Sequence, residues 1–305
     1  MMLRRRSIVL ASLTADALAL GAHWIYDTRQ IDEQIGRMDT LRDPLPTSFH
    51  TTKRRGEFTH YGDQTLLLLR SLSEAGRFSL VTFSRMWQAM FDDYTGYRDQ
   101  ATRVTLGRLA EGQAPEEAGS TSSDLGGAAR IAPLVYRYQH DEESLMEAVR
   151  RQTAMTHRNT DVVDSAVYFA MVALLVMRDY TPSAAIEKVT HVAFDRSPFK
   201  EWVEMGLASR NESTREAIGR FGQACDVKAA FPGVIHLVAK YQDAPREGLI
   251  ENVMAGGDSA ARGLLTGMVF GAYAGTEAIA PEWLTVLKSR PLIEDHLEVL
   301  SKAME

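Results

Sequence analysis

The sequence predicts an all-α fold in which one helix follows another. Apolar residues recur at spacings of three and four along most of the chain, which is the pattern of helices with one buried face. No stretch alternates apolar and polar residues with the β-branched enrichment of a strand. Turn residues separate the periodic segments, at Gly76, Thr95-Gly96, Gly112–Pro115 and Thr181-Pro182. We therefore expect a single large helical domain over residues 1–305.

The composition limits the classes of function. The chain has 305 residues, 45% of them hydrophobic and 24% charged, as in ordinary globular proteins. Its net charge of -6 argues against nucleic acid as a partner. The single cysteine, Cys225, excludes an intrachain disulfide and fits a reducing compartment. Asp16 interrupts the signal-like N-terminus early, and no apolar run reaches the roughly 18 residues of a membrane span. We expect a cytoplasmic protein that does not bind membranes.

The first helix is expected over residues 7–22. Its side chains are mostly small and apolar, which predicts a buried central helix. Asp16 lies within it, and a buried carboxylate must be paired, hydrogen-bonded or metal-bound. It either bonds a neighbouring helix N-terminus or has a functional role. His23 follows the helix, beside the flat rings of Trp24 and Tyr26, and is either a core histidine or part of a pocket wall.

Residues 39–60 are expected to form a long loop, because proline and threonine are frequent there. Its basic group, Lys53-Arg54-Arg55, is either a solvated turn or a receptor for a phosphate. Helices are then expected over residues 66–72, 83–91, 102–110, 126–138, 144–153, 162–177, 184–193, 234–241, 247–254, 264–274, 281–288 and 293–304. The charged stretch 195–222 is expected to be a helical insertion at the surface.

Two turns place an aspartate after glycine at the start of an apolar helix. Asp63 lies in Tyr61-Gly62-Asp63-Gln64, and Asp258 follows Gly256-Gly257. Each carboxylate is either a helix N-cap or a ligand that faces a cavity. Because two such turns can converge in a helical fold, they define a candidate site.

A glycine at every fourth position marks one face of the helix that follows Asp258, at Gly263, Gly267, Gly271 and Gly275. Glycine within a helix costs about 1 kcal/mol relative to alanine, so the stripe indicates that another backbone packs close to it. The alanine-rich first helix is the expected partner. Their packing would bring Asp16 towards Asp258.

Taken in order, the motifs resemble the ADP-ribosylglycohydrolase superfamily over most of the chain. The motifs are Thr14-Ala15-Asp16-Ala17-Leu18, Tyr61-Gly62-Asp63-Gln64, Ser123-Asp124-Leu125-Gly126-Gly127-Ala128-Ala129-Arg130-Ile131-Ala132-Pro133, Thr156-His157-Arg158 and Gly256-Gly257-Asp258. Three phrases are more similar to the J1-crystallin branch: His23-Trp24-Ile25-Tyr26-Asp27, Tyr61-Gly62-Asp63-Gln64-Thr65 and Gly257-Asp258-Ser259-Ala260-Ala261-Arg262. The resemblance implies an orthogonal helical bundle with a central cleft.

In active members of that superfamily, the resemblance implies two Mg²⁺ ions held by a Thr-Asp-Asp turn and an Asp-x-Asp-Thr turn. Here the first turn keeps one carboxylate, Asp63, and the second keeps Asp258, followed by Ser259-Ala260-Ala261. We therefore expect at most one weakly bound Mg²⁺, at a partial site of Asp63 and Asp258 with Gln64 or Ser259.

The implied activity is hydrolysis of an ADP-ribosyl or related nucleotide-sugar bond, with ADP-ribose or an ADP-ribosylated protein as ligand. The expected catalytic residues are Asp63, Asp258 and Asp99, of which Asp99 acts as a general base unless it only caps a helix. The expected substrate-binding residues are Asp16, His23, Tyr61, Gln64, Asp124, His157 and Ser259.

Two alternatives stay open. The first is a catalytically silent member, either a nucleotide-binding or a crystallin-like structural protein, in which Asp63 and Asp258 are plain caps. The second is a hydrolase of another mechanism built on His23, His60 and Asp63. Binding of ADP-ribose distinguishes the ADP-ribosyl hydrolase from a purely structural protein.

Overall fold

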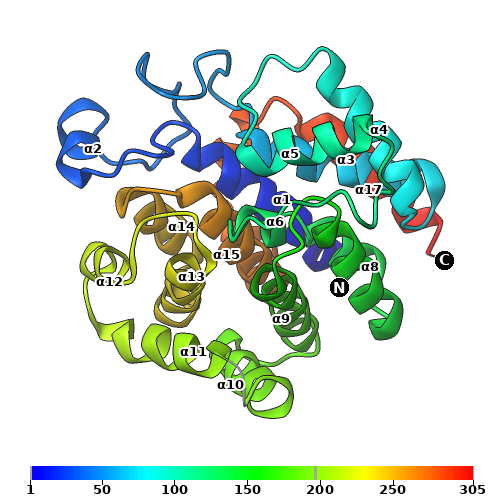
Figure 1. Ribbon diagram of the computed structural model, residues 1–305. Coiled ribbons are helices and arrows are strands. Elements are labelled where there is room, and N and C mark those ends of the chain that lie inside the picture. Colours follow the sequence, from blue (N-terminus) through cyan, green and yellow to red (C-terminus); the bar gives the residue numbers. More distant parts are fainter. Residues whose placement is uncertain (1, 196–197, 305) are drawn as a thin grey trace.

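A computed structural model describes residues 2–195 and 198–304, which form helices joined by turns and by two long loops, 35–59 and 111–125 (Figure 1). The elements are α1 (Met2–Ala19), α2 (Thr28–Gln34), α3 (His60–Ala75), α4 (Leu80–Asp92), α5 (Gln100–Ala110), α6 (Gly126–Ala129), α7 (Ala132–Arg137), α8 (Glu142–Ala154), α9 (Thr160–Met177), α10 (Pro182–Ala193), α11 (Pro198–Ala208), η1 (Ser209–Asn211), α12 (Thr214–Phe221), α13 (Val227–Tyr241), α14 (Pro245–Met254), α15 (Ser259–Ala274), η2 (Gly275–Ala278), α16 (Pro281–Val286) and α17 (Arg290–Lys302). Over these residues, β pairing is confined to two isolated bridges. The predicted all-α class is confirmed.

The centre of the molecule is the antiparallel pair of α1 and α15. A Cβ on Gly271 would lie 2.2 Å from the carbonyl oxygen of Ser7, and one on Gly267 would lie 2.5 Å from that of Ala11. Only glycine lets the two backbones approach this closely. The predicted contact with the alanine-rich first helix is therefore confirmed for Gly263, Gly267 and Gly271, whereas Gly275 ends α15 as its C-cap with a φ of 63°.

The other helices enclose this pair. α9, α13 and α14 pack against α15, whereas α3 and α7 pack against α1. Figure 1 shows α1 and α15 in the middle, with α10 to α13 on one side and α3, α4 and α17 on the other. Among the described helices, α9 has the length and apolarity of a membrane span, but 61% of that window is buried inside the molecule, as in a core helix.

The polar stretch 195–222 contributes α11 and α12, which pack against α13. Trp202 is only 7% exposed, and its ring centroid lies 4.9 Å from that of Phe199 and 5.7 Å from that of Phe231 in α13. The described charged residues of this stretch are exposed or half-buried, while Phe199 and Trp202 join the main core. Residues 196–197 lie outside the described residues.

Helix boundaries differ from the sequence prediction at both ends of the first helix. α1 begins at Met2 instead of Ser7 and ends at Ala19 instead of Ala22. The chain then turns, and Trp24 adopts a positive φ of 65°, which a continuing helix excludes. The short helix α2 lacks a distinct apolar period and was not predicted.

The helix predicted over 126–138 is divided into α6 and α7. Pro133 lies in the first turn of α7 and has no backbone N–H for a bond to the preceding turn. Arg130, between the two helices, is fully buried and hydrogen-bonded to the side chains of Gln64 and Thr156. The proline and these bonds together break the helix.

Candidate functional site

A cavity of about 620 Å³ lies where four segments meet. The turn after α1 supplies Trp24, the start of α5 supplies Asp99, and the loop before α6 supplies Asp124. The loop before α13 supplies Cys225 and Asp226. The sequence predicted two of these residues, Asp99 and Asp124, as part of one site, and they do line one cavity.

Backbone hydrogen bonds join the turn after α1 to the turn before α15. The amide of Trp24 donates to the carbonyl of Gly257 at 2.9 Å, and the amide of Gly257 donates to the carbonyl of Ile25 at 2.8 Å. Gly257 has a φ of 65°, and a Cβ there would lie 2.2 Å from the carbonyl oxygen of Gln223. The glycine before Asp258 is therefore needed both for its conformation and for the close approach.

Tyr61 connects the carboxylates of Asp124 and Asp258. Its hydroxyl lies 2.9 Å from Asp124 Oδ2 and 3.1 Å from Asp258 Oδ2. A phenol donates only one proton, so both contacts are hydrogen bonds when one carboxyl is protonated and donates to the phenol oxygen. The two aspartates thus form a pair suited to sharing a proton.

Electrostatics support that sharing. Burial, with repulsion from Asp258 and Asp99, raises the pKa of Asp124 to about 7. Burial also raises the pKa of Asp258. The carboxylate of Asp258 caps α15 by accepting from the amide of Ala261 at 3.1 Å, and this hydrogen bond only partly opposes the rise. Burial and the same two carboxylates raise the pKa of Tyr61 well above its ordinary value. Near neutral pH, the pair therefore holds a proton beside the cavity.

Asp99 behaves in the opposite way. It caps α5 by accepting from the amide of Thr102, and its Oδ2 lies 3.4 Å from His60 Nε2. Burial alone would raise the pKa of Asp99, but its interactions with His60 outweigh burial and hold the pKa below its usual range. Asp99 is thus an ionised carboxylate and a helix cap at once.

Asp63 is not the helix cap. Thr59 caps α3, so Asp63 lies one turn inside the helix. Its carboxylate pairs with the ammonium of Lys53 and accepts from the hydroxyl of Tyr94 at 2.5 Å. Burial raises the pKa of Asp63 despite the favourable charge of Lys53.

The two-magnesium arrangement does not fit these donors. Lys53 already supplies the positive charge at Asp63, and Asp258 uses its oxygens for the α15 cap and Tyr61. Ala260 and Ala261 offer no ligand atom. Mg²⁺ prefers a near-octahedral shell of oxygens, and these side chains do not provide two such shells.

Gln64 and His157 belong to a buried network around Arg130. The Gln64 side-chain oxygen accepts from Trp87 Nε1 at 2.8 Å and from Arg130. His157 Nδ1 lies 2.9 Å from the hydroxyl of Thr156, and burial, with the charge of Arg130, lowers its pKa to about 3. These residues support the site from the interior, because neither lines the cavity.

Asp16 and Ser259 are fully buried. Asp16 accepts from the amide of Thr59 at 2.8 Å and from its hydroxyl at 2.6 Å, so it bonds the N-terminus of a neighbouring helix. The Ser259 hydroxyl follows the Asp258 cap and has no hydrogen-bond partner among the described residues.

Sequence reasoning missed three nearby residues. Cys225 lies with Asp124 and Asp258, with one ligand atom from each within 4.8 Å of the others, and His50 lies with His23 and His60 at the same spacing. Tyr97 lines the cavity beside Trp24. All three lie in loops, where no periodicity or spacing marks a position. Their only signal is the residue type.

Comparisons with known proteins agree with this architecture. Crystallin J1A of Tripedalia cystophora is 23% identical over 325 aligned residues, covering 99% of this chain and 97% of that protein. Crystallin J1B of the same organism is 22% identical, covering 95% and 94%. The predicted similarity to the J1-crystallins is confirmed.

A solved structure described as an ADP-ribosylglycohydrolase-related protein complex superposes with a TM-score of 0.75 at 22% identity, covering 100% of this chain and 99% of that one. This likeness shows the fold. The model of the family described as ADP-ribosylglycohydrolase matches residues 3–305, nearly the whole length. The chain therefore belongs to the ADP-ribosylglycohydrolase family.

Proposed function

We propose that this protein hydrolyses the glycosidic bond of an ADP-ribosyl group or a related nucleotide sugar. The observation that carries the proposal is one cavity whose lining includes the carboxylates of Asp99 and Asp124 and the aromatic rings of Trp24 and Tyr97. Paired carboxylates are the usual acid and base of glycosidic hydrolysis, and flat rings bind sugars and bases by stacking. Family membership supports the same class of substrate.

The two carboxylates have complementary roles. Asp124 donates its proton to the leaving atom as that atom separates from the anomeric carbon. Asp99 accepts a proton from the water whose oxygen bonds to the same carbon, so the reaction consumes one water and ends with Asp124 ionised and Asp99 protonated; a proton returns to Asp124 and leaves Asp99 through solvent before the next turnover. The raised pKa of Asp124, to about 7, suits the acid role at neutral pH.

Asp258 and Tyr61 act as positioning residues. Asp258 disfavours the ionised form of Asp124, and Tyr61 orients both carboxyls through its hydroxyl. Asp63 is part of the supporting structure through its pair with Lys53. We expect at most one weakly bound Mg²⁺, and the proposed acid–base step does not depend on it.

The binding half of the proposal is tested by thermal denaturation with ADP-ribose, once with Mg²⁺ and once with a chelator. A ligand that binds only the folded state stabilises it by about 2.7 kcal/mol at 100 times its Kd. We expect ADP-ribose to raise the Tm in both conditions. An unchanged Tm in both would contradict the proposal.

The catalytic half is tested with Asp124→Asn on ADP-ribosylated protein substrates. The variant should retain ADP-ribose binding and lose activity by roughly 100-fold or more, because the general acid is gone. Asp141→Asn is the control, since Asp141 caps α8 at the surface and asparagine caps equally well. Equal activity of both variants would exclude Asp124 as the acid.

A catalytically silent role is the second candidate. This role is favoured by the turns of Asp63 and Asp258, which each keep a single carboxylate, and by similarity to proteins named crystallins. It predicts that ADP-ribose raises the Tm, or leaves it unchanged, while no substrate is cleaved. Turnover by the wild type that is lost in Asp124→Asn would exclude it.

A further inference from the structure

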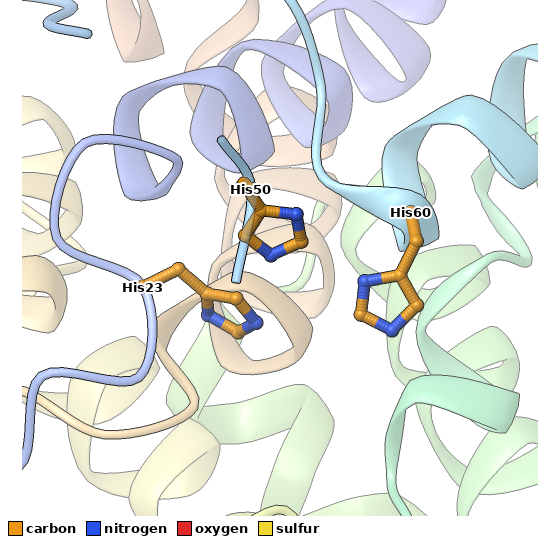
Figure 2. Close-up of side chains that lie close together, drawn as sticks. All are labelled: His23, His50 and His60. Carbon is orange, nitrogen blue, oxygen red and sulfur yellow. The ribbon is translucent and has the colours of Figure 1, made fainter. Parts of the chain in front are cut away.

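Three histidines from three separate segments meet beside the cavity (Figure 2). His23 follows α1, His50 lies in the loop between α2 and α3, and His60 is the first residue of α3. All three are at most 2% exposed. Figure 2 shows their rings around a common space, with ring nitrogens directed into it.

None of the six ring nitrogens of these histidines has a hydrogen-bond partner among the described residues. Buried polar side-chain atoms are hydrogen-bonded in the large majority of cases, and each exception calls for an explanation. Two of the six, His60 Nε2 and His23 Nδ1, face carboxylates, and the other four indicate a group that the protein atoms alone do not supply. A cation with affinity for neutral imidazole satisfies several of them at once.

The spacing of the rings fits one bound ion. Imidazoles bound tetrahedrally at about 2.1 Å have ring centroids roughly 5.2 Å apart. The observed centroid distances are 5.3 Å for His23 and His50, 5.6 Å for His50 and His60, and 6.4 Å for His23 and His60. One nitrogen from each ring lies within 4.8 Å of the other two, so a bound ion requires the rings, now inclined by 25° to 45° to one another, to rotate towards it.

Two carboxylates stand behind the cluster. Asp99 Oδ2 lies 3.4 Å from His60 Nε2, and Asp258 Oδ1 lies 3.9 Å from His23 Nδ1. Histidines that bind a metal commonly direct their second ring nitrogen to a carboxylate, which fixes the tautomer. This leaves His60 Nδ1 and His23 Nε2 for the ion. The carboxylates also provide negative charge to balance a divalent cation.

We propose that His23, His50 and His60 bind one divalent transition-metal ion of the Zn²⁺ class. Three neutral imidazoles suit such borderline ions, whereas Mg²⁺ requires oxygen ligands. The ligands are therefore different in kind from the oxygen ligands of the family's magnesium centre. It stands independently of the proposed hydrolysis, because it needs no substrate.

The ion would fasten the long loop to the core. His50 comes from the loop between α2 and α3, whereas His23 lies in the turn after α1 and His60 begins α3. The rings of Trp24 and Tyr97, which line the cavity, also contact the histidines, with centroids 4.4 Å apart for Trp24 and His23 and 5.3 Å apart for Tyr97 and His60. Metal binding thus orders one wall of the cavity.

The test is a calorimetric titration of the chelator-treated full-length protein with Zn²⁺, in excess Mg²⁺. We expect about one Zn²⁺ per chain, and a Kd that is weaker by roughly 100-fold or more in His50→Gln. Asp99→Asn keeps the α5 cap but loses the carboxylate, so it should weaken binding about tenfold. No saturable binding by the wild type, or equal binding by His50→Gln, overturns the proposal.

Two matched controls separate this site from others. His140→Gln removes an exposed histidine, and Cys225→Ser disrupts the neighbouring group of Asp124, Cys225 and Asp258. Both should bind Zn²⁺ as the wild type does. If His50→Gln does not fold, X-ray absorption of the Zn²⁺-loaded wild type decides: nitrogen ligands at about 2.0 Å support the site, and a sulfur at about 2.3 Å overturns it.

Discussion

Tyr61 links the carboxyl groups of Asp124 and Asp258. Its ring packs against Gly126, where an added Cβ would lie 2.2 Å from a ring carbon, and its hydroxyl contacts both Asp124 and Asp258. One buried phenol thus orients two carboxyls that would otherwise repel each other. A neutral hydrogen bond in a buried site is worth about 1 kcal/mol, and leaving its partner unsatisfied costs about 1–3 kcal/mol.

Tyr61→Phe should therefore lower the free energy of unfolding by about 1–3 kcal/mol. Because the Tyr61 hydrogen bond lowers the pKa of Asp124, its loss should also move the alkaline limb of the pH–activity profile to higher pH. Urea denaturation and initial rates measure the two effects. Tyr136→Phe is the control, since it removes a buried hydroxyl bonded to Leu297 without touching the site. An unshifted limb in Tyr61→Phe would argue against its positioning role.

Asp16 makes stability depend on pH. Burial raises its pKa to about 7, although the Thr59 bonds oppose the shift. In the unfolded chain, the pKa is about 3.9, so between pH 4 and 7 the folded state binds more protons. Stability then falls as pH rises through this window, and the loss is complete above pH 7.

Asp16→Asn removes this titration. Its free energy of unfolding, relative to the wild type, should rise by roughly 1–4 kcal/mol between pH 5 and pH 8. The asparagine still accepts from the Thr59 amide and can donate to its hydroxyl. Denaturation curves at both pH values measure the change. Asp141→Asn should show no such difference, because the pKa of Asp141 is lowered by its bonds to Ser144 and it stays ionised throughout. A constant Asp16→Asn difference would contradict the assigned shift.

The packing of α1 against α15 positions two segments of the site relative to each other. α1 carries Asp16 and leads into His23, whereas α15 begins at the Asp258 cap. The backbones approach so closely that the residues between them are alanine, glycine and serine. A side chain added at this contact must separate the helices or strain the backbone.

Gly267→Ala should lower the free energy of unfolding by about 1–3 kcal/mol through overpacking. The added methyl would lie 2.5 Å from a carbonyl oxygen of α1, which cannot rotate away. Gly107→Ala is the matched control: it lies in α5 with open space around the new methyl, so it should gain about 0.5–1 kcal/mol. Chemical denaturation compares them. Equal effects would show that α1 and α15 can separate without cost.

The molecule as a whole is expected to unfold as one domain. Trp202 of α11 packs against Phe231 of α13, and α13 packs against the central helix α15. This chain of contacts connects the charged stretch 195–222 with the centre of the fold. A surface attachment would lack such a connection.

Trp202→Ala should lower the free energy of unfolding of the entire chain by about 3–5 kcal/mol and leave one transition. Met205→Ala, on the same helix but 38% exposed, should change it far less. Circular dichroism and tryptophan fluorescence, followed together, should give coincident curves. Two separate transitions in either variant would show that 195–222 belongs to an independent unit.

The helices, the glycine stripe and the family could be predicted from the sequence because each is a local or repeating pattern. Apolar faces recur with the period of the helix. Glycine at every fourth position indicates a close helix contact, and it can be recognised from that one segment of the sequence. The two glycine–aspartate turns were recognised in the same way, and Asp258 does cap α15. Asp63 was assigned less well, because Thr59 four positions earlier caps α3 instead.

Contacts across long separations in the chain depend on the folded loops. Lys53 meets Asp63, His50 joins His23 and His60, and Cys225 reaches Asp124 and Asp258. The loops that carry Lys53, His50 and Cys225 have no periodic pattern, and they connect α2 to α3 and α12 to α13, so the packing of those helices decides where the loops lie. The sequence thus specifies helices and turns through short-range geometry, whereas the chemistry of the site arises from which loops the packed helices bring together.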